Sequence, residues 1–339
     1  MPDAKDYLLF SSSSVLNALK LSKRMFFLPS VIIYPSNACN YDCVMCTNKR
    51  SSVQKIQLMD IALMKKILKE CSRFIIRPKV HISGLGEPLV YPKIKEALKL
   101  AKNLDWSMTT NGYHLDKCII DILENRCHAL NISIHGDAIE HNKITNTPGS
   151  FQKVVESIKK LDEKKRAFGR KYPLVAINCV FNNDNIQNLK KILARFQDLP
   201  INSITFQHQI FMKGDVNNKD SFVLKGFQLK ALEDFLRYIK KEKFRVKINV
   251  FPKIKTNHIK HYYTADDKLF NMSCIIPWLS VRIYPDGEVQ TCFRSLGNVK
   301  DLPLKKIINS NQALELRDAI RKGRFNIPYC FRCCHRHFY

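Results

Sequence analysis

The chain lacks any long apolar run. Its 339 residues contain no uninterrupted apolar stretch near the roughly 20 residues that a membrane-spanning helix needs. The opening stretch, MPDAKDYLLFSSSS, carries mixed charge and lacks the basic start and long apolar centre of a secretory signal peptide. The chain also has no internal repeat and no low-complexity tract. These absences argue against a membrane-spanning or secreted protein and predict a cytoplasmic one.

Acidic residues are scarce. Asp and Glu number 30 against 56 Lys and Arg, so the formal net charge at pH 7 is +26. Such an excess attracts polyanions, for example nucleic acid, anionic lipid or phosphorylated small molecules. A bias of the coding sequence towards lysine would give the same excess. The charge alone therefore identifies no partner, although it favours an anionic one.

Strand-like and helix-like segments alternate from residue 30 onward. Hydrophobic residues make up 45% of the chain, which is ordinary for a globular protein. The apolar, β-rich runs are residues 30–35, 79–84, 106–112, 129–136, 174–181 and 203–211. Amphipathic helical stretches lie between them, at residues 58–74, 92–104, 115–126, 150–166 and 185–196. This alternation predicts an α/β fold with a parallel sheet and helices on its outer face.

Six such units are too few for a closed eight-unit barrel, so the sequence predicts a partial, open (β/α)6 TIM-like barrel. In such folds the site lies at the carboxyl ends of the strands. We expect an N-terminal extension at 1–26, with a covering helix near 15–27, and the barrel at 27–250. A linker at 251–272 would lead to a small C-terminal domain at 273–339, with a β-hairpin around Pro285-Asp286-Gly287 and one helix.

The twelve cysteines are unevenly placed. In a cytoplasmic protein, clustered cysteines are more often metal ligands or catalytic thiols than disulfides. Cys39, Cys43 and Cys46 follow the first predicted strand. They are compatible with a disulfide pair and a spare thiol, with a zinc site short of one ligand, or with a [4Fe–4S] cluster that leaves one iron open. The single cysteines at 71, 118, 127 and 179 are predicted to be buried core residues.

The surroundings of this motif resemble the radical S-adenosylmethionine (radical SAM) superfamily. The motif is Cys39-x3-Cys43-x2-Cys46, with the apolar Met45 before the last cysteine. The next three predicted strands end in GLGEP (84–88), TTNG (109–112) and SIHG (133–136), which resemble family elements at the same places. The resemblance extends over roughly residues 30–210 and resumes near 274.

The resemblance implies a [4Fe–4S] cluster held by Cys39, Cys43 and Cys46, with an open iron site that binds S-adenosylmethionine. One electron would cleave that cofactor to a 5′-deoxyadenosyl radical, which abstracts a hydrogen atom from a substrate inside the barrel. Gly84, Gly86 and Glu87 would hold the methionyl ammonium group. Asn111 and Ser133 would face the rest of the cofactor. By position, the substrate candidates are His135, Gln207 and His208.

The C-terminal segment has its own cysteines. Its spacing resembles the auxiliary-cluster domain called SPASM, or its shorter relative, the twitch domain. The resemblance implies one auxiliary [4Fe–4S] cluster held by Cys274, Cys292, Cys330 and Cys333, with Cys334 as a rival to Cys333. A structural zinc ribbon is the alternative, and the vicinal thiols of RCCHRH also suit a soft metal ion.

Three functions follow from these observations. The first is a radical SAM oxidoreductase or epimerase that acts on a small polar, anionic metabolite and takes electrons from a donor such as flavodoxin or ferredoxin. The second is a radical SAM maturase that modifies a peptide or protein side chain. The third, from another class, is a zinc-stabilised nucleic-acid-binding protein. That third function does not explain three cysteines at one strand end and GLGEP and TTNG at the next two.

Overall fold

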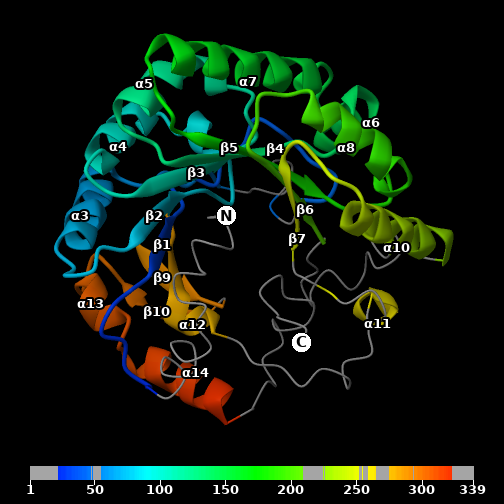
Figure 1. Cartoon of the computed structure of the whole chain (residues 1–339). Helices are drawn as coiled ribbons and strands as arrows, with labels where there is room; N and C mark the ends of the chain where they lie inside the picture. The colour runs from blue at the N-terminus through cyan, green and yellow to red at the C-terminus, as the bar shows by residue number, and fades with distance from the viewer. Residues whose placement is uncertain are drawn as a thin grey trace.

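A single ten-stranded sheet organises the chain, and it does not close on itself. The computed structural model describes residues 22–46, 48, 55–208, 224, 226–251, 254, 259–264, 275–292 and 294–322. The strand order is β10-β9-β8-β1-β2-β3-β4-β5-β6-β7, so β10 and β7 are the outermost of the described strands in a curved, open sheet (Figure 1). The strands are β1 Ser30–Ile33, β2 Lys79–Ile82, β3 Trp106–Thr110, β4 Ala129–Ser133, β5 Leu174–Val180, β6 Ser203–Gln207, β7 Lys247–Phe251, β8 Ser280–Ile283, β9 Glu288–Thr291 and β10 Arg294–Asn298.

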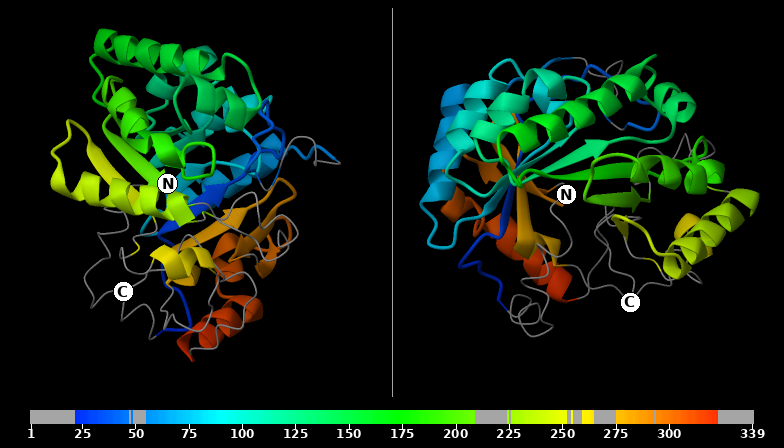
Figure 2. Two further views of the ribbon diagram at one scale, coloured as in Figure 1. Left: turned by 90° about the vertical axis from the view of Figure 1, so that its right-hand side faces the viewer. Right: turned by 45° about the horizontal axis from the view of Figure 1, so that its top comes forward.

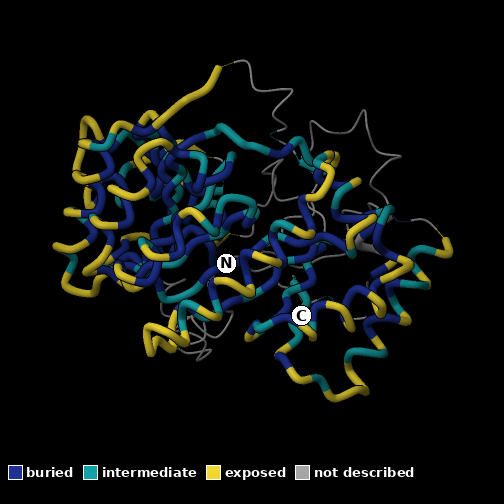
Figure 3. Tube along the Cα trace, turned by 90° about the horizontal axis from the view of Figure 1, so that it is seen from above, coloured by how far each residue is buried: buried dark blue, intermediate teal, exposed yellow. Residues whose placement is uncertain are grey.

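Helices cover the outer face of this sheet (Figure 1). They are α3 Ile61–Ser72, α4 Ile94–Ala101, α5 Ile119–Glu124, α6 Ala138–Thr145, α7 Ser150–Ala167, α8 Leu189–Gln197 and α10 Gly226–Lys241. Along β5, buried and half-buried residues alternate strictly, with Val175, Ile177 and Cys179 on the buried side. That alternation places the apolar side chains against the helices and the others on the inner, concave face. Figure 3 shows the exposed positions along the outer sides of the helices.

All six predicted strands are present, and each pairs in parallel with the next along the chain. The sheet is longer than the six units that the sequence predicts. At one edge β7 adds in parallel to β6. At the other edge β8 adds in parallel to β1, with Ile32 opposite Arg282. The predicted cysteines at 71, 118, 127 and 179 are all buried, as expected of core residues.

The predicted C-terminal hairpin forms, and it continues the main sheet instead of forming a separate one. Its strands β8 and β9 are joined by the predicted turn, with Gly287 at φ 91°, and β9 pairs with β10. Both views in Figure 2 show these strands beside β1. Three helices complete this part: α12 Ile276–Leu279, α13 Leu304–Ile307 and α14 Asn311–Arg321. The predicted domain boundaries stay predictions, and residues 1–21 lie outside the described residues.

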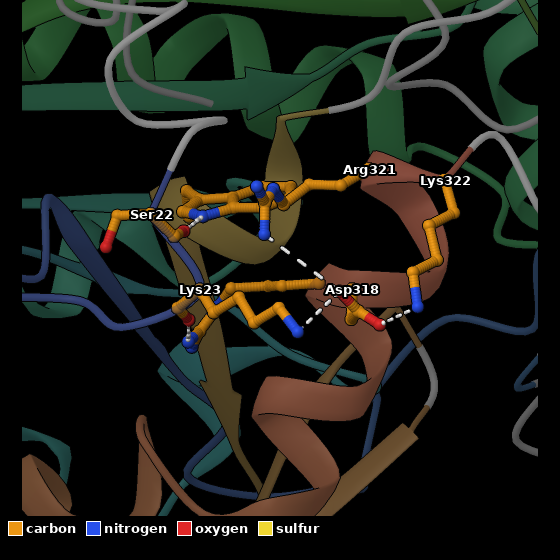
Figure 4. A network of polar contacts seen from close by, with 7 residues as sticks. Ser22, Lys23, Asp318, Arg321 and Lys322 are labelled. Carbon is orange, nitrogen blue, oxygen red and sulfur yellow. Dashed lines mark hydrogen bonds and ion pairs between the residues drawn. The ribbon is translucent and has the colours of Figure 1, made fainter.

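The helix α14 ties the start of the described chain to its end. The carboxylate of Asp318 forms ion pairs with the side-chain nitrogens of Lys23 and Lys322, each at 2.8 Å (Figure 4). A guanidinium nitrogen of Arg321 lies 3.9 Å from the same carboxylate. The two lysines hold the pKa of Asp318 at about 2, below its usual range. The buried Arg317 donates to the backbone oxygens of Lys23, Pro277 and Ile308. These bonds hold residues 22–25 against the C-terminal part of the described chain.

Candidate active site

The three clustered cysteines lie together in the loop that follows β1. Cys39, Cys43 and Cys46 are each half-buried. Burial raises the pKa of the Cys39 thiol to about 11 and that of Cys43 to about 12, and the neighbouring thiols of the motif add to both shifts. The three cysteines lie within eight consecutive residues of this one loop. That the three thiols together hold one cluster stays a prediction.

Backbone N–H groups point at two of these sulfur atoms. The N–H of Tyr41 donates to Cys39 Sγ at 3.4 Å, and the N–H of Asn48 donates to Cys46 Sγ at 3.3 Å. A tight turn brings Cys46 N to the oxygen of Cys43 at 3.0 Å. N–H donors beside a sulfur atom stabilise its thiolate form, which is the form that binds iron.

The C-terminal end of α6 holds the cysteine loop in place. The N–H of Val44 donates to the oxygen of Ile144 at 2.9 Å, and that of Asp42 donates to the oxygen of Thr145 at 3.3 Å. The last carbonyls of a helix have no partner within the helix, so they are available to fix a loop. At its other end α6 is held by a capping box between Asp137 and Glu140.

An aromatic side chain anchors the same loop. Tyr41 is only 3% exposed and meets the ring of Tyr113 edge-on at 5.7 Å and that of His141 at 6.3 Å. Burial raises the pKa of Tyr41 strongly, so its hydroxyl stays protonated. His141 is fully buried, and its Nδ1 accepts the N–H of His135 at 3.1 Å. Tyr41 thus links the cysteine loop to the segments that follow β3 and β4.

The glycine-rich turn after β2 packs directly on the cysteine loop. The N–H of Glu87 donates to the oxygen of Ala38 at 2.8 Å, and the side-chain amide of Asn48 donates to the oxygen of Leu85 at 2.9 Å. A Cβ on Gly86 would stand 2.0 Å from the oxygen of Ala38, and one on Gly84 would stand 2.9 Å from that of Gly86. Only glycine fits at 86, because two backbones meet there.

The carboxylate of Glu87 joins the end of β2 to the end of β3. Glu87 is only 3% exposed. Its carboxylate accepts hydrogen bonds from the hydroxyl of Thr110 at 2.5 Å, the backbone N–H of Asn111 at 2.6 Å and the backbone N–H of Leu89 at 3.0 Å. Burial raises its pKa to about 7 in spite of these donors. Glu87 therefore acts first as a clamp inside the protein. Its predicted contact with a methionyl ammonium group stays a prediction.

Asn111, held by Glu87, reaches back to the cysteine motif. Its side-chain amide donates to Asn40 Oδ1 at 2.8 Å and lies 4.0 Å from Cys39 Sγ. The structure thus brings Cys39, Glu87 and Asn111 into one connected region at the carboxyl ends of β1, β2 and β3. This is the edge of the sheet at which the sequence places the site.

The predicted substrate residues lie further along the same edge. His135 follows β4 and is buried; its Nδ1 accepts the N–H of Val180 at 3.3 Å, and burial lowers its pKa to about 4. His208 follows β6 and is fully buried; its Nδ1 meets the hydroxyl of Tyr263 at 2.6 Å. Gln207 is half-buried at the end of β6. Both histidine rings thus contact neighbouring protein groups, and their contact with substrate stays a prediction.

The inner face of the sheet carries uncharged polar side chains. Ser133, Asn178, Thr205 and Asn249 lie side by side in register on β4, β5, β6 and β7. On the other half of the sheet, the buried His81 meets Ser107 and Thr109, at 2.8 and 2.9 Å. Hydroxyl and amide groups therefore line this concave face.

The comparisons with known proteins agree with this arrangement. The model of the radical SAM superfamily matches residues 33–206, which is half of the chain. The chain belongs to the radical SAM superfamily. A second model, of the SPASM iron–sulfur cluster-binding domain, matches residues 274–334. The protein is therefore a radical SAM enzyme with an auxiliary-cluster domain, and the hypothesis of a zinc-stabilised nucleic-acid-binding protein is set aside.

The relatives of this radical SAM enzyme are distant. A "Probable GTP 3′,8-cyclase" of Saccharolobus islandicus (strain L.S.2.15 / Lassen #1) is 26% identical over 311 residues, which cover 88% of this chain and 92% of the relative. The structure of Streptococcus suis SuiB bound to precursor peptide SuiA aligns with a TM-score of 0.67 at 16% identity, over 89% of this chain and 69% of SuiB. The structure of anSMEcpe with bound AdoMet and Cp18Cys peptide gives 0.62 at 19%, over 91% and 88%. These two structures show a shared fold.

The residues of the radical SAM site fit a [4Fe–4S] cluster. Three thiols share one loop, N–H donors point at two of the sulfur atoms, and the loop backbone is fixed on both sides. Among the described residues, no three His, Cys, Asp or Glu side chains converge as the ligands of a single metal ion do. The cysteines of a cube each bind a different iron atom, so their sulfur atoms need not converge in that way. Of the auxiliary cysteines, Cys292 is described, and Cys274, Cys330, Cys333 and Cys334 lie outside the described residues.

Sequence reasoning missed several supporting residues of this radical SAM enzyme. Asn40, Tyr41 and Asn48 lie inside or directly after the cysteine motif, and each holds the loop to another strand end. Asn182, after β5, donates to Met45 Sδ at 3.5 Å. For Asn40, Tyr41 and Asn48 a signal was available, since they are polar or aromatic residues close to the cysteines in the sequence; for Asn182 there was none. In the described part of the chain, no helix is long and apolar enough to cross a membrane.

Proposed function

We propose that this radical SAM enzyme abstracts a hydrogen atom from a small polar, anionic metabolite, such as a sugar or nucleotide derivative. The observation that carries the proposal is the row Asn178, Thr205 and Asn249, which continues across three adjacent strands from the predicted cofactor contact Ser133. Hydroxyl and amide side chains in register match a ligand with many hydroxyl, amide or carbonyl groups. A substrate of mainly apolar character would leave these groups without partners.

Two further features support this substrate class. Asn131, on β4 next to the row, is 4% exposed, and its side-chain nitrogen has no hydrogen-bond partner within the described protein. A ligand oxygen would satisfy that donor. Arg282, opposite Ile32 on β8, adds a guanidinium group to the same concave face and suits an anionic substituent. The name of the relatives, GTP 3′,8-cyclase, fits a phosphorylated substrate as well.

The protein's own residues have separate tasks in this proposal. Cys39, Cys43 and Cys46 would hold the cluster, and Tyr41 and the end of α6 would fix their loop. Glu87 would hold Asn111 and the glycine turn in place, so that Gly84, Gly86, Glu87, Asn111 and Ser133 face S-adenosylmethionine. When bound and reduced, the cluster supplies the electron that cleaves this cofactor.

We include one auxiliary [4Fe–4S] cluster in the proposal, held by Cys274, Cys292, Cys330 and Cys333, with Cys334 as the rival for the last place. Cys292 ends β9 in a left-handed conformation, at φ 49°, and packs against Ile275, Ile276 and Leu279. A non-glycine residue is seldom held this way unless its surroundings require it. The second cluster would serve electron transfer or substrate binding in an oxidation or epimerisation. A cytoplasmic donor such as flavodoxin or ferredoxin would supply electrons.

The experiment that tests this function is anaerobic. The purified chain is reconstituted, and its iron and sulfide are counted; two cubes predict about eight irons. Dithionite and S-adenosylmethionine are then added, and 5′-deoxyadenosine is measured. The control is the chain with Cys39, Cys43 and Cys46 all changed to alanine, which should form none of the nucleoside. Zinc without iron, and no nucleoside from the wild type, would contradict the proposal.

The substrate class is tested with deuterated candidates. Phosphorylated sugars and nucleotides should raise 5′-deoxyadenosine formation and transfer deuterium into it. Arg282→Gln should raise the apparent KM for such a substrate, while Arg195→Gln, an equal loss of charge on the exposed face of α8, should not. Deuterium transfer from a peptide encoded beside the gene, with none from any metabolite, would favour the peptide maturase instead.

A further inference from the structure

A basic pocket lies at the end of the sheet opposite the active site. It has a volume of about 410 Å³ and is lined by Arg126, His128, Gly169, Arg170, Lys171 and Tyr172, among others. His128 directly precedes β4, and Tyr172 lies just before β5. The cysteine loop and its supports lie at the carboxyl ends of the strands, so this pocket is separate from the proposed active site. We refer to it as the β4–β5 basic pocket.

Positive charge gathers in the lining of this pocket. Two arginines and a lysine line it, and none of its lining residues is acidic. On the two adjacent helices, Asp121 of α5 pairs with Lys95 at 3.3 Å and Asp162 of α7 pairs with Arg166 at 2.9 Å. Glu124 and Glu163 of the same helices are exposed and do not line the pocket. Like charges around one hollow repel one another, and a bound anion would remove that repulsion.

Two stacked rings form part of the wall. The rings of His128 and Tyr172 lie 4.7 Å apart at an interplanar angle of 26°, and Tyr172 is 41% exposed. The backbone of His128 is fixed on both sides, because its N–H donates to the oxygen of Trp106 and its own oxygen accepts the N–H of Leu174, each at 2.9 Å. The rings therefore stand on rigid strand ends. Partly exposed aromatic rings beside arginines suit the stacking of a nucleobase.

Two of the lining residues end neighbouring helices in a left-handed conformation. Arg126 ends the turn after α5 in a left-handed conformation, at φ 60°, and Gly169 ends α7 at φ 58°. Glycine adopts this conformation freely, but arginine rarely does. This conformation closes both helix ends, where the N–H of Cys127 donates to the oxygen of Ile122 and the N–H of Arg170 donates to that of Lys165. It places Arg126 and Arg170 at the same end of the sheet.

We propose that the β4–β5 basic pocket binds a nucleotide. Arg126, Arg170 and Lys171 contact its phosphates, and its base packs against the stacked rings of His128 and Tyr172. The volume lies within the range of small-molecule sites, roughly 300–1,000 Å³. This proposal does not rest on the proposed active-site chemistry, because every residue that carries it lies at the other end of the strands.

The test uses the full chain, reconstituted anaerobically and saturated with S-adenosylmethionine. Binding of ADP, pyrophosphate and ribose 5-phosphate is measured by isothermal titration calorimetry at low and physiological salt. We expect ADP to bind at least tenfold more tightly than ribose 5-phosphate. The double variant Arg126→Asn/Arg170→Gln should weaken ADP at least tenfold, and asparagine is chosen at 126 because it tolerates a left-handed backbone. Tyr172→Ala should weaken ADP several-fold but leave pyrophosphate nearly unchanged.

The controls distinguish binding in this pocket from binding elsewhere on the protein. Arg195→Gln removes one charge from the exposed face of α8 and should leave ADP binding unchanged. Loss of ADP binding in Arg282→Gln, with none in the pocket variants, would assign the nucleotide to the active site and overturn the proposal. Absence of binding by the wild type would overturn it as well. So would a single-stranded oligonucleotide that binds through Arg126 and Arg170 more tightly than ADP, since the pocket would then serve nucleic acid.

Discussion

The backbone N–H of Glu87 donates a hydrogen bond of 2.8 Å to the carbonyl oxygen of Ala38. Ala38 directly precedes the first cysteine of the motif, and Glu87 follows the glycine turn. Two segments that are far apart in the sequence are therefore one structural unit at the carboxyl ends of β1 and β2. A change in either segment should shift both the cysteine ligands and the predicted cofactor contacts.

Gly86→Ala should separate these two segments. The new methyl group would stand 2.0 Å from the oxygen of Ala38, which is backbone and cannot move aside alone. We expect the variant to retain less than half of the iron of the first cluster and to bind S-adenosylmethionine weakly. Iron content and the electron paramagnetic resonance spectrum of the reduced protein measure this.

The matched control is Gly149→Ala. Gly149 has φ 75°, and no atom lies within 4 Å of a Cβ placed there, so alanine adds backbone strain of roughly 1–2 kcal/mol and no clash. This variant should keep its iron. Equal iron in Gly86→Ala and the wild type would show that the loops separate without consequence for the cluster.

Glu87→Gln should loosen the end of β3. The carboxylate accepts one hydroxyl and two backbone N–H groups, while glutamine offers one oxygen and turns an NH2 group towards at least one of these donors. We expect a loss of roughly 1–3 kcal/mol in the free energy of unfolding and an altered spectrum of the first cluster. Glu96→Gln, on the exposed side of α4, should change neither. If Glu87→Gln had the spectrum and the stability of the wild type, the result would contradict the clamp role of Glu87.

The sequence predicted the strands and their order well, because apolar β-rich runs between amphipathic helices leave few alternatives. It also placed Cys39, Gly86 and Asn111 at successive strand ends, and the parallel topology then brings them together. It did not predict that β8 would pair with β1. That pairing joins segments about 250 residues apart, and no local pattern specifies such a contact.

The supporting residues were harder to foresee for a different reason. Tyr41 is a single aromatic residue within a cysteine motif, and its partners Tyr113 and His141 come from two other loops. The sequence suggests the histidines at 135 and 208 as substrate contacts because they follow strands, and this stays a prediction. The structure shows that both rings are buried against neighbouring protein groups, and burial cannot be read from position at a strand end.

Tyr41→Ala should weaken the anchorage of the cysteine loop. It removes a buried ring that meets Tyr113 and His141, and a substitution of this kind usually costs roughly 3–5 kcal/mol. Tyr41→Phe keeps the ring and should keep most of the iron. The measurement is the rate at which the wild type, Tyr41→Ala and Tyr41→Phe lose iron to a chelator. If Tyr41→Ala loses iron no faster than Tyr41→Phe, the backbone bonds to α6 alone hold the loop.

Acid should destabilise the protein through its buried histidines, and His208 is the clearest case. Burial lowers its pKa from 6.5 to about 3, so the folded protein holds it neutral. Between these values the unfolded chain binds one more proton than the folded chain. The stabilising effect is therefore complete above pH 6.5 and is lost as the pH falls, by on the order of 1–2 kcal/mol at pH 5.

The test replaces both members of the pair, His208→Phe/Tyr263→Phe, so that no buried hydroxyl loses its partner. Between pH 5 and 6 the free energy of unfolding of the wild type should fall with acid more steeply than that of the double variant, by about 1 kcal/mol per pH unit. Urea unfolding followed by tryptophan fluorescence under anaerobic conditions gives the slopes. His128→Gln, at a half-buried position outside this pair, serves as the control and should keep the slope of the wild type. Equal slopes for the wild type and the double variant would mean that His208 is protonated in the folded protein, against the burial that the structure shows.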